Sequence, residues 1–156
     1  MGLRLESLYY HISEKELQGL AQSVAARVKT GDVVFLSGDL GSGKTTFMKA
    51  VAGAYGLDQR TVRSPTFTLI NRYETKEAGG KSRNVLFHLD CYRIDSVALE
   101  NIGFFDLSTE EAIVFIEWPE NVLPLFRKVD WLFTFFIPED TMSVRDVRVY
   151  RHHLIH

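Results

Sequence analysis

The sequence of 156 residues is poor in the features of secreted and membrane-spanning proteins. It has one cysteine, Cys91, so no internal disulfide can form, and such a composition is typical of a reducing compartment. No apolar run approaches the roughly 20 residues that span a bilayer. The first residues also lack the pattern of a signal peptide. We therefore expect a cytoplasmic protein that has no membrane partner.

The chain also lacks a surplus of positive charge. It carries 18 Lys and Arg residues against 20 Asp and Glu residues, a formal net charge of −2. Proteins that bind nucleic acid over a broad face are usually strongly basic, because they must neutralise phosphates. We therefore do not expect such a face here. The length suits a single domain, which we place at residues 1–156, with a sizeable core.

One short motif dominates what is present. The segment Gly38–Thr45 fits G-x-x-x-x-G-K-[ST], the phosphate-binding P-loop. Glycines such as Gly41 and Gly43 let the backbone approach an anion closely, so that consecutive N–H groups cradle its oxygens. In this motif Lys44 reaches the β- and γ-phosphates, and the Thr45 hydroxyl is a ligand of Mg²⁺. The motif therefore predicts a site for a magnesium nucleotide.

The residues that flank the motif support this interpretation. Residues 32–37 form an apolar, β-branched and aromatic run, which predicts a buried strand that leads into the loop. Apolar residues then recur at helical spacing from Phe47 to Tyr55, and Gly56 supplies a helix stop. Strand, loop and helix follow one another in the order that a P-loop requires.

The remaining pattern predicts an α/β fold, a single-domain P-loop NTPase. We expect a mixed, mostly parallel central sheet flanked by helices, with a C-terminal antiparallel hairpin. A capping box, Ser13 with Glu16, begins a helix after a first strand. We expect strands near residues 5–12, 67–73, 84–90, 112–117, 131–137 and 144–154, a loop over 60–66, a short helix within 95–107 and another that begins at 118–120.

Two carboxylates end predicted strands. Asp90 ends one and Glu117 the other, and ligands of open α/β sheets bind beyond the carboxyl ends of strands. Mg²⁺ prefers one or two carboxylates together with phosphate oxygens and water. Either acid can serve as a metal ligand, or it can orient an attacking water. The competing interpretation is an ordinary acid that faces solvent.

Several other residues have two interpretations each. Thr66, with Ser64, is a candidate sensor of the γ-phosphate or the metal, or else belongs to a local turn around a proline. Trp118 stacks on a base or a partner, or is simply packed. His88 is more typical of a hydrogen-bonded core histidine than of a catalyst, and Cys91 of a packed side chain.

Four stretches taken together resemble the TsaE family, the small bacterial ATPases of the tRNA threonylcarbamoyladenosine pathway. The resemblance covers most of the chain up to Pro119, with the stretches in the family's order and spacing. They are residues 38–46 (GDLGSGKTT), 62–69 (VRSPTFTL), 88–93 (HLDCYR) and 116–119 (IEWP).

The resemblance implies ATP and Mg²⁺ as cofactors, with the metal held by Thr45 and Glu117. It implies functional roles for Asp90 and Trp118, and slow ATP hydrolysis that depends on a partner complex. The partners would be TsaB and TsaD, which transfer the threonylcarbamoyl group to adenosine 37 of tRNAs that read ANN codons, so that this protein meets tRNA only indirectly. We take Lys44, Asp90 and Glu117 as candidate catalytic residues, and as candidate nucleotide-binding residues Ser13, Glu14, Asp39, Leu40, Gly41, Ser42, Gly43, Lys44, Thr45, Thr46, Thr66 and Trp118.

Two alternatives remain open. A small-molecule P-loop kinase would need an acceptor pocket and usually an arginine-bearing lid, and no Arg-rich stretch lies between Asp90 and Glu117. A GTP switch commonly selects guanine with an N-K-x-D stretch, which the sequence does not contain.

Overall fold

A seven-stranded sheet runs through the whole protein. The computed structural model describes residues 2–65, 68–75 and 84–153. The strands follow one another across the sheet in the order β1-β7-β6-β2-β5-β4-β3. Their bounds are β1 Leu3–Ile12, β2 Val33–Ser37, β3 Ile70–Glu74, β4 Val85–Asp90, β5 Ala112–Glu117, β6 Trp131–Phe136 and β7 Arg145–His152.

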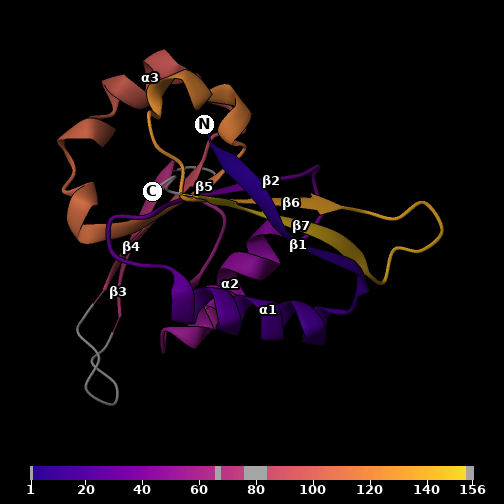
Figure 1. Ribbon diagram of the computed structural model, residues 1–156. Coiled ribbons are helices and arrows are strands. Elements are labelled where there is room, and N and C mark those ends of the chain that lie inside the picture. The colour runs from indigo at the N-terminus through magenta and orange to yellow at the C-terminus, as the bar shows by residue number, and fades with distance from the viewer. Residues whose placement is uncertain (1, 66–67, 76–83, 154–156) are drawn as a thin grey trace.

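The sheet is mixed, and its parallel part lies in the middle. Strand β2 pairs in parallel with both β5 and β6, and β5 pairs in parallel with β4. The outer pairs β3–β4, β6–β7 and β1–β7 are antiparallel. This arrangement confirms the predicted α/β class, the hairpin of β3 and β4, and the antiparallel C-terminal pair. It also brings the carboxyl ends of β2, β4 and β5 to one edge of the sheet (Figure 1).

Helices α1 (Glu14–Arg27) and α2 (Lys44–Ala54) cover one face of the sheet (Figure 1). The predicted capping box is present, because the Ser13 hydroxyl accepts from the Glu16 N–H and the Glu16 carboxylate accepts from the Ser13 N–H. Phe47 of α2 is fully buried and packs against Phe133 and Phe135 of β6. These contacts fix the helix that carries the P-loop onto the sheet.

Short helical segments cover the opposite face. They are α3 (Ser96–Asn101) and the one-turn 3-10 segments η2 (Phe104–Asp106), η3 (Thr109–Glu111), η4 (Pro119–Asn121) and η5 (Leu123–Leu125). A further 3-10 turn, η1 (Gln59–Thr61), follows α2 and contacts it. Leu99 and Phe104 pack there on Phe35, Leu89 and Ile116. Alternate residues of the central strands thus face two separate cores, and β5 is buried along its whole length, as its apolar run predicts.

The structure differs most from the predicted elements in three places. Strand β3 begins at Ile70, because Leu69 takes a positive φ of 63°, which breaks the extended chain before it; Phe67 lies outside the described residues. The segment over 60–66 begins with the turn η1. The short helix expected from residue 118 is two separate 3-10 turns, η4 and η5.

No helix in the described part of the chain is long and apolar enough to cross a membrane.

Candidate nucleotide site

The P-loop backbone takes conformations that its glycines permit. Gly38 has a φ of 151°, and a Cβ at this position would lie 2.6 Å from the Ser42 Oγ and 2.7 Å from the Phe135 carbonyl oxygen. Gly43, with a φ of 110°, turns the chain into α2 as the residue before the helix. L-residues with side chains rarely adopt such angles, so both positions favour glycine on steric grounds. The loop is therefore shaped by backbone geometry, as the motif predicts.

The N-terminus of α2 is open toward the loop. No side chain caps it, and among the described residues no acceptor binds the N–H groups of Gly43, Lys44 and Thr45. The Ser42 hydroxyl is buried and has no hydrogen-bond partner within the part of the chain that the structure describes. Uncapped N–H groups and the positive end of the helix dipole favour an anion at this point.

The Lys44 side chain lies within the loop that it follows. Its ammonium group donates to the carbonyl oxygens of Gly38 and Asp39, the latter at 2.9 Å, and lies 4.3 Å from the centre of the Trp118 ring. Lys44 is only 5% exposed, and burial lowers the pKa of its amine, whereas the neighbouring carboxylates of Glu117 and Asp90 oppose that shift. A buried ammonium held only by neutral carbonyls and a ring is well suited to an anionic ligand.

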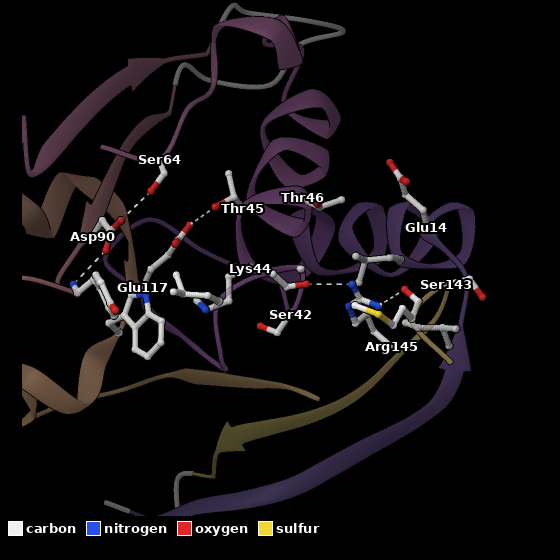
Figure 2. Close-up of a pocket in the computed structure, with 18 of the residues that line it drawn as sticks. Glu14, Ser42, Lys44, Thr45, Thr46, Ser64, Asp90, Glu117, Ser143 and Arg145 are labelled. Carbon is white, nitrogen blue, oxygen red and sulfur yellow. Dashed lines mark hydrogen bonds between the residues drawn. The ribbon is translucent and has the colours of Figure 1, made fainter. Parts of the chain in front are cut away.

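Glu117 is the most enclosed acid of the site. It is 3% exposed, and its Oε1 accepts from the Thr45 hydroxyl at 3.1 Å (Figure 2). The same oxygen lies 2.9 Å from Nε2 of His88. The competing interpretation of a solvent-facing acid at Glu117 is therefore wrong. His88 is fully buried and hydrogen-bonded, as predicted for a core histidine, and its partner is this carboxylate.

Asp90 lies beside Glu117 on the neighbouring strand, at the paired register position. Its carboxylate accepts from the Ser64 hydroxyl at 2.7 Å and from the Tyr92 N–H at 3.0 Å. Trp118 has a φ of 57°, a strained angle for a bulky residue, and its ring lies 4.7 Å from that of Tyr92. Trp118 is thus held between Tyr92 and Lys44 at the edge of the site.

These groups line one cavity of about 760 Å³, a volume typical of small-molecule sites. In Figure 2 Asp90 and Glu117 lie at one end of the cavity and Glu14 and Arg145 at the other, with Lys44 between them. Most of the predicted site residues line this cavity, namely Ser13, Glu14, Leu40, Gly41, Ser42, Gly43, Lys44, Thr45, Thr46, Asp90, Glu117 and Trp118.

Two predicted residues are not among them. Asp39 does not line the cavity, and its contact with the site is the backbone carbonyl that accepts from Lys44. Thr66 lies outside the described residues, so its predicted role as a sensor stays a prediction, although Ser64 does reach Asp90. Cys91 is fully buried, and burial raises the pKa of its thiol to about 12, which agrees with the predicted packing role.

The sequence analysis missed the far wall of the cavity. Met142, Ser143 and Arg145, at the turn between β6 and β7, line it. The Arg145 guanidinium donates to the carbonyl oxygen of Gly41 at 2.9 Å and to those of Met142 and Val144 at 2.7 Å. No local pattern marks these residues, because only the pairing of β6 with β2 brings the turn to the P-loop.

Comparison with known proteins identifies the family. Residues 11–146 match the family model described as "Threonylcarbamoyl adenosine biosynthesis protein TsaE". The chain is also 40% identical over 141 residues to the "tRNA threonylcarbamoyladenosine biosynthesis protein TsaE" of Aquifex aeolicus, an alignment that covers 89% of this chain and 92% of the relative.

The chain belongs to the TsaE family.

Further relatives agree with this assignment. The TsaE protein of Bacillus subtilis is 36% identical over 119 residues, which cover 74% of this chain and 70% of the relative. Among solved structures, Bacillus subtilis YdiB superposes with a TM-score of 0.71 over 96% of this chain and 88% of that chain, at 24% identity. The latter likeness concerns the fold alone. The matched TsaE range includes the P-loop, Asp90, Glu117 and Arg145.

Proposed function

We propose that this TsaE-family chain binds and hydrolyses Mg·ATP in support of threonylcarbamoyladenosine formation at adenosine 37 of tRNAs that read ANN codons. The observation that carries the nucleotide part is the convergence of the P-loop, Thr45 and two strand-end carboxylates on one cavity. Support for the pathway comes from the relatives, which are named tRNA threonylcarbamoyladenosine biosynthesis proteins.

The residues of the cavity fit a triphosphate. The open N–H groups at the start of α2 and the buried, unpartnered Ser42 hydroxyl are donors without acceptors among the described residues. An anion at this point would satisfy them and would draw the Lys44 ammonium away from the carbonyl oxygens of Gly38 and Asp39. The chain's own groups therefore bind and orient the phosphates.

The same end of the cavity fits a magnesium ion. Thr45 and Glu117 supply a hydroxyl and a carboxylate that already touch, and one carboxylate with a hydroxyl is a donor set that Mg²⁺ accepts when phosphate oxygens and water complete it. Within the described residues no group of three His, Cys, Asp or Glu side chains forms a cage for a metal alone. Bound Mg²⁺ would neutralise charge on the phosphates.

Asp90 is the group best placed to orient a water. Its two carboxylate oxygens are held by Ser64 and Tyr92, and it lies in the same cavity as Lys44 and Glu117. A carboxylate fixed in this way can accept a proton or hold a water in line. We assign Lys44 to the phosphates, Glu117 to the metal and Asp90 to the water.

We further propose that the protein acts in the cytoplasm with the TsaB–TsaD pair and does not modify tRNA itself. The absence of a basic surplus supports this division of labour, because direct tRNA binding usually depends on many phosphate contacts.

Substitution of Lys44 tests the proposal. Calorimetric titration of the wild type with Mg·ATP and Mg·ADP should give binding, and Lys44→Ala should weaken it about a hundredfold or abolish hydrolysis, because the phosphate charge then lacks its partner. Lys49→Ala, on the same helix but outside the cavity, is the matched control and should bind as the wild type does. Full hydrolysis by Lys44→Ala, or no binding by the wild type at millimolar nucleotide, contradicts the assignment. Transfer of phosphate to an added small acceptor would instead identify a kinase.

A further inference from the structure

Charge is distributed unevenly along the chain. Residues 94–126 contain seven acids and no Lys, Arg or His, although the chain as a whole has nearly balanced charge. Glu117 is the buried acid of the nucleotide site, and the other six are exposed. None of these six takes part in an ion pair with any residue that the structure describes; they are Asp95, Glu100, Asp106, Glu110, Glu111 and Glu120.

Large apolar side chains are exposed among these acids. They are Val97 of α3, Ile102 just after α3, Phe105 of η2 and Leu123 of η5, which are 62%, 43%, 52% and 39% exposed. Helix α3 contacts both η2 and η5, so the four side chains come from segments that pack together above the sheet (Figure 1). We call these four residues, with the exposed acids Asp95, Glu100, Asp106 and Glu120 of the same stretch of segments, the α3–η5 face.

Phe105 is the aromatic residue of this face, and its ring contacts two other aromatic rings. Its ring lies 5.1 Å from that of Phe104 and 6.4 Å from that of Phe126, and Phe126 in turn lies 5.5 Å from Phe35 of the core. An exposed aromatic ring that is supported by a buried cluster loses little conformational freedom when a partner covers it. Such rings are typical of the residues that dominate protein–protein binding.

The α3–η5 face is tied to the mouth of the nucleotide cavity. The Asn121 side-chain amide donates to the Cys91 and Tyr92 carbonyl oxygens, at 2.7 and 3.3 Å. This bond joins η4, which begins after Trp118, to the segment whose Tyr92 ring packs on Trp118. Glu120, one of the six acids, accepts from Ser37 at the end of the strand that leads into the P-loop.

We propose that the α3–η5 face is the docking surface for a protein partner that presents an apolar patch ringed by Lys and Arg side chains. The acids select a basic rim and repel the phosphates of a nucleic acid, and Phe105 with its apolar neighbours supplies the buried centre. Because the face adjoins Trp118, the partner sits beside the open nucleotide cavity. This inference rests on the proposed function, and we expect the basic partner to belong to the proposed TsaB–TsaD pair.

Binding of purified TsaB–TsaD pair to variants of the full chain tests the proposal. Phe105→Ala should raise the dissociation constant about tenfold or more, and Glu100→Lys should raise it about fivefold. High salt should reduce the affinity of Glu100→Lys for the pair less than it reduces the affinity of the wild type. The matched controls are Tyr10→Ala, an exposed aromatic residue of β1, and Glu139→Lys, an exposed acid of the β6–β7 turn. Both controls should bind as the wild type does, and all four variants should keep the nucleotide affinity of the isolated protein.

The possible outcomes distinguish failure of the docking surface from failure of the proposed ATPase function. Equal binding of the pair by the wild type, Phe105→Ala and Glu100→Lys overturns the docking surface and leaves the ATPase proposal intact. A wild type that binds Mg·ATP but not the pair overturns the partner assignment and this inference together. Binding of a tRNA transcript that Phe105→Ala abolishes, or a dimer of this chain that Phe105→Ala dissociates, assigns the face to another occupant and also overturns it.

Discussion

At the scale of single residues, the histidine behind Glu117 is the least expected part of the site. His88 Nε2 and the Thr45 hydroxyl meet the same oxygen, Oε1, of the Glu117 carboxylate. The other ring nitrogen of His88 is buried and has no partner among the described residues. Because a carboxylate oxygen accepts hydrogen bonds, Nε2 of His88 is the donor in this contact. Oε1 then has two hydrogen-bond partners, and Oε2, which accepts from none of the described residues, is left for a ligand.

Substitution of His88 should therefore change how the site uses magnesium. We expect His88→Leu to lose most of the additional thermal stabilisation that Mg·ADP gives over ADP alone, because the Glu117 carboxylate is no longer held. His88→Gln places an amide N–H near the position of Nε2 and should restore much of the difference. Thermal shift assays at fixed ADP with rising Mg²⁺ measure this. Identical magnesium dependence in the wild type and His88→Leu would show that Thr45 alone holds the carboxylate.

At the same scale, a motif predicts contacts between residues close in sequence but not contacts between strands. The P-loop glycines, Lys44 and Thr45 follow from their spacing, because the phosphate cradle is made by adjacent residues. The contact of His88 with Glu117 joins two strands, and alternation along one strand gives only the face on which His88 lies. Asp39 was predicted to bind nucleotide because it belongs to the motif, yet its side chain does not line the cavity.

At the scale of elements, the turn between β6 and β7 braces the P-loop. Arg145 binds the carbonyl oxygens of its own turn and also that of Gly41. We expect Arg145→Ala to weaken nucleotide binding about three- to tenfold, since loss of this bond frees the loop that must hold the phosphates. Calorimetric titration with Mg·ADP gives the change. Arg148→Ala, on the same strand but outside the cavity, is the control, and an equal loss there would indicate a general effect of charge.

A second bridge joins β1 to α1. The Arg27 guanidinium beside Glu6 lowers the pKa of that carboxyl below its ordinary value through a hydrogen bond and charge, although partial burial opposes the shift. A lowered pKa in the folded state contributes stability above the ordinary pKa of Glu, and this contribution is lost as the pH falls through the lowered value.

Glu6→Gln should therefore flatten the acid limb of the stability curve. We expect the free energy of unfolding to fall less steeply below about pH 5 in this variant than in the wild type, because one titrating group is removed. Urea unfolding at a series of pH values measures the slopes. Glu139→Gln, an exposed acid without an ion pair in the described structure, should leave the slope unchanged, and an unchanged slope in Glu6→Gln would contradict the linkage.

Elements with strong local patterns could be predicted, and their boundaries and partners could not. The capping box and the apolar stripe of α1 are local signals, as is the continuous apolar run of β5. The beginning of β3 depends on the left-handed turn at Leu69, a residue type that rarely adopts it, so no sequence pattern marked the boundary. Strand order depends on contacts between distant parts of the chain. No sequence pattern in β6, β7 or β2 predicts that β6 lies between the other two.

At the scale of the whole molecule, one aromatic cluster joins the helical layer to the sheet. Phe47 of α2 lies 4.9 Å from Phe133 and 5.5 Å from Phe135, ring centre to ring centre, and has no exposed surface. Phe47→Ala should lower the free energy of unfolding by about 3–5 kcal/mol, because it removes a buried ring and leaves a cavity. Chemical denaturation measures the loss.

The matched exposed substitution sets the scale for this loss. Tyr10→Ala, on β1, should change the free energy of unfolding by less than about 0.5 kcal/mol, as surface substitutions usually do. A small loss in Phe47→Ala would mean that α2 is held mainly by its other contacts. In that case the position of the P-loop would not depend on the aromatic cluster.

The strand order has a consequence for synthesis on the ribosome. The first strand of the sheet, β1, pairs only with the last, β7, and β6 supplies one of the two neighbours of β2. A nascent chain that has emerged only as far as Glu117 already carries every phosphate- and metal-directed group assigned above, but its β2 still has a bare flank. Competence to hold nucleotide should therefore appear only after β6 and β7 have emerged and docked on β2 and β1.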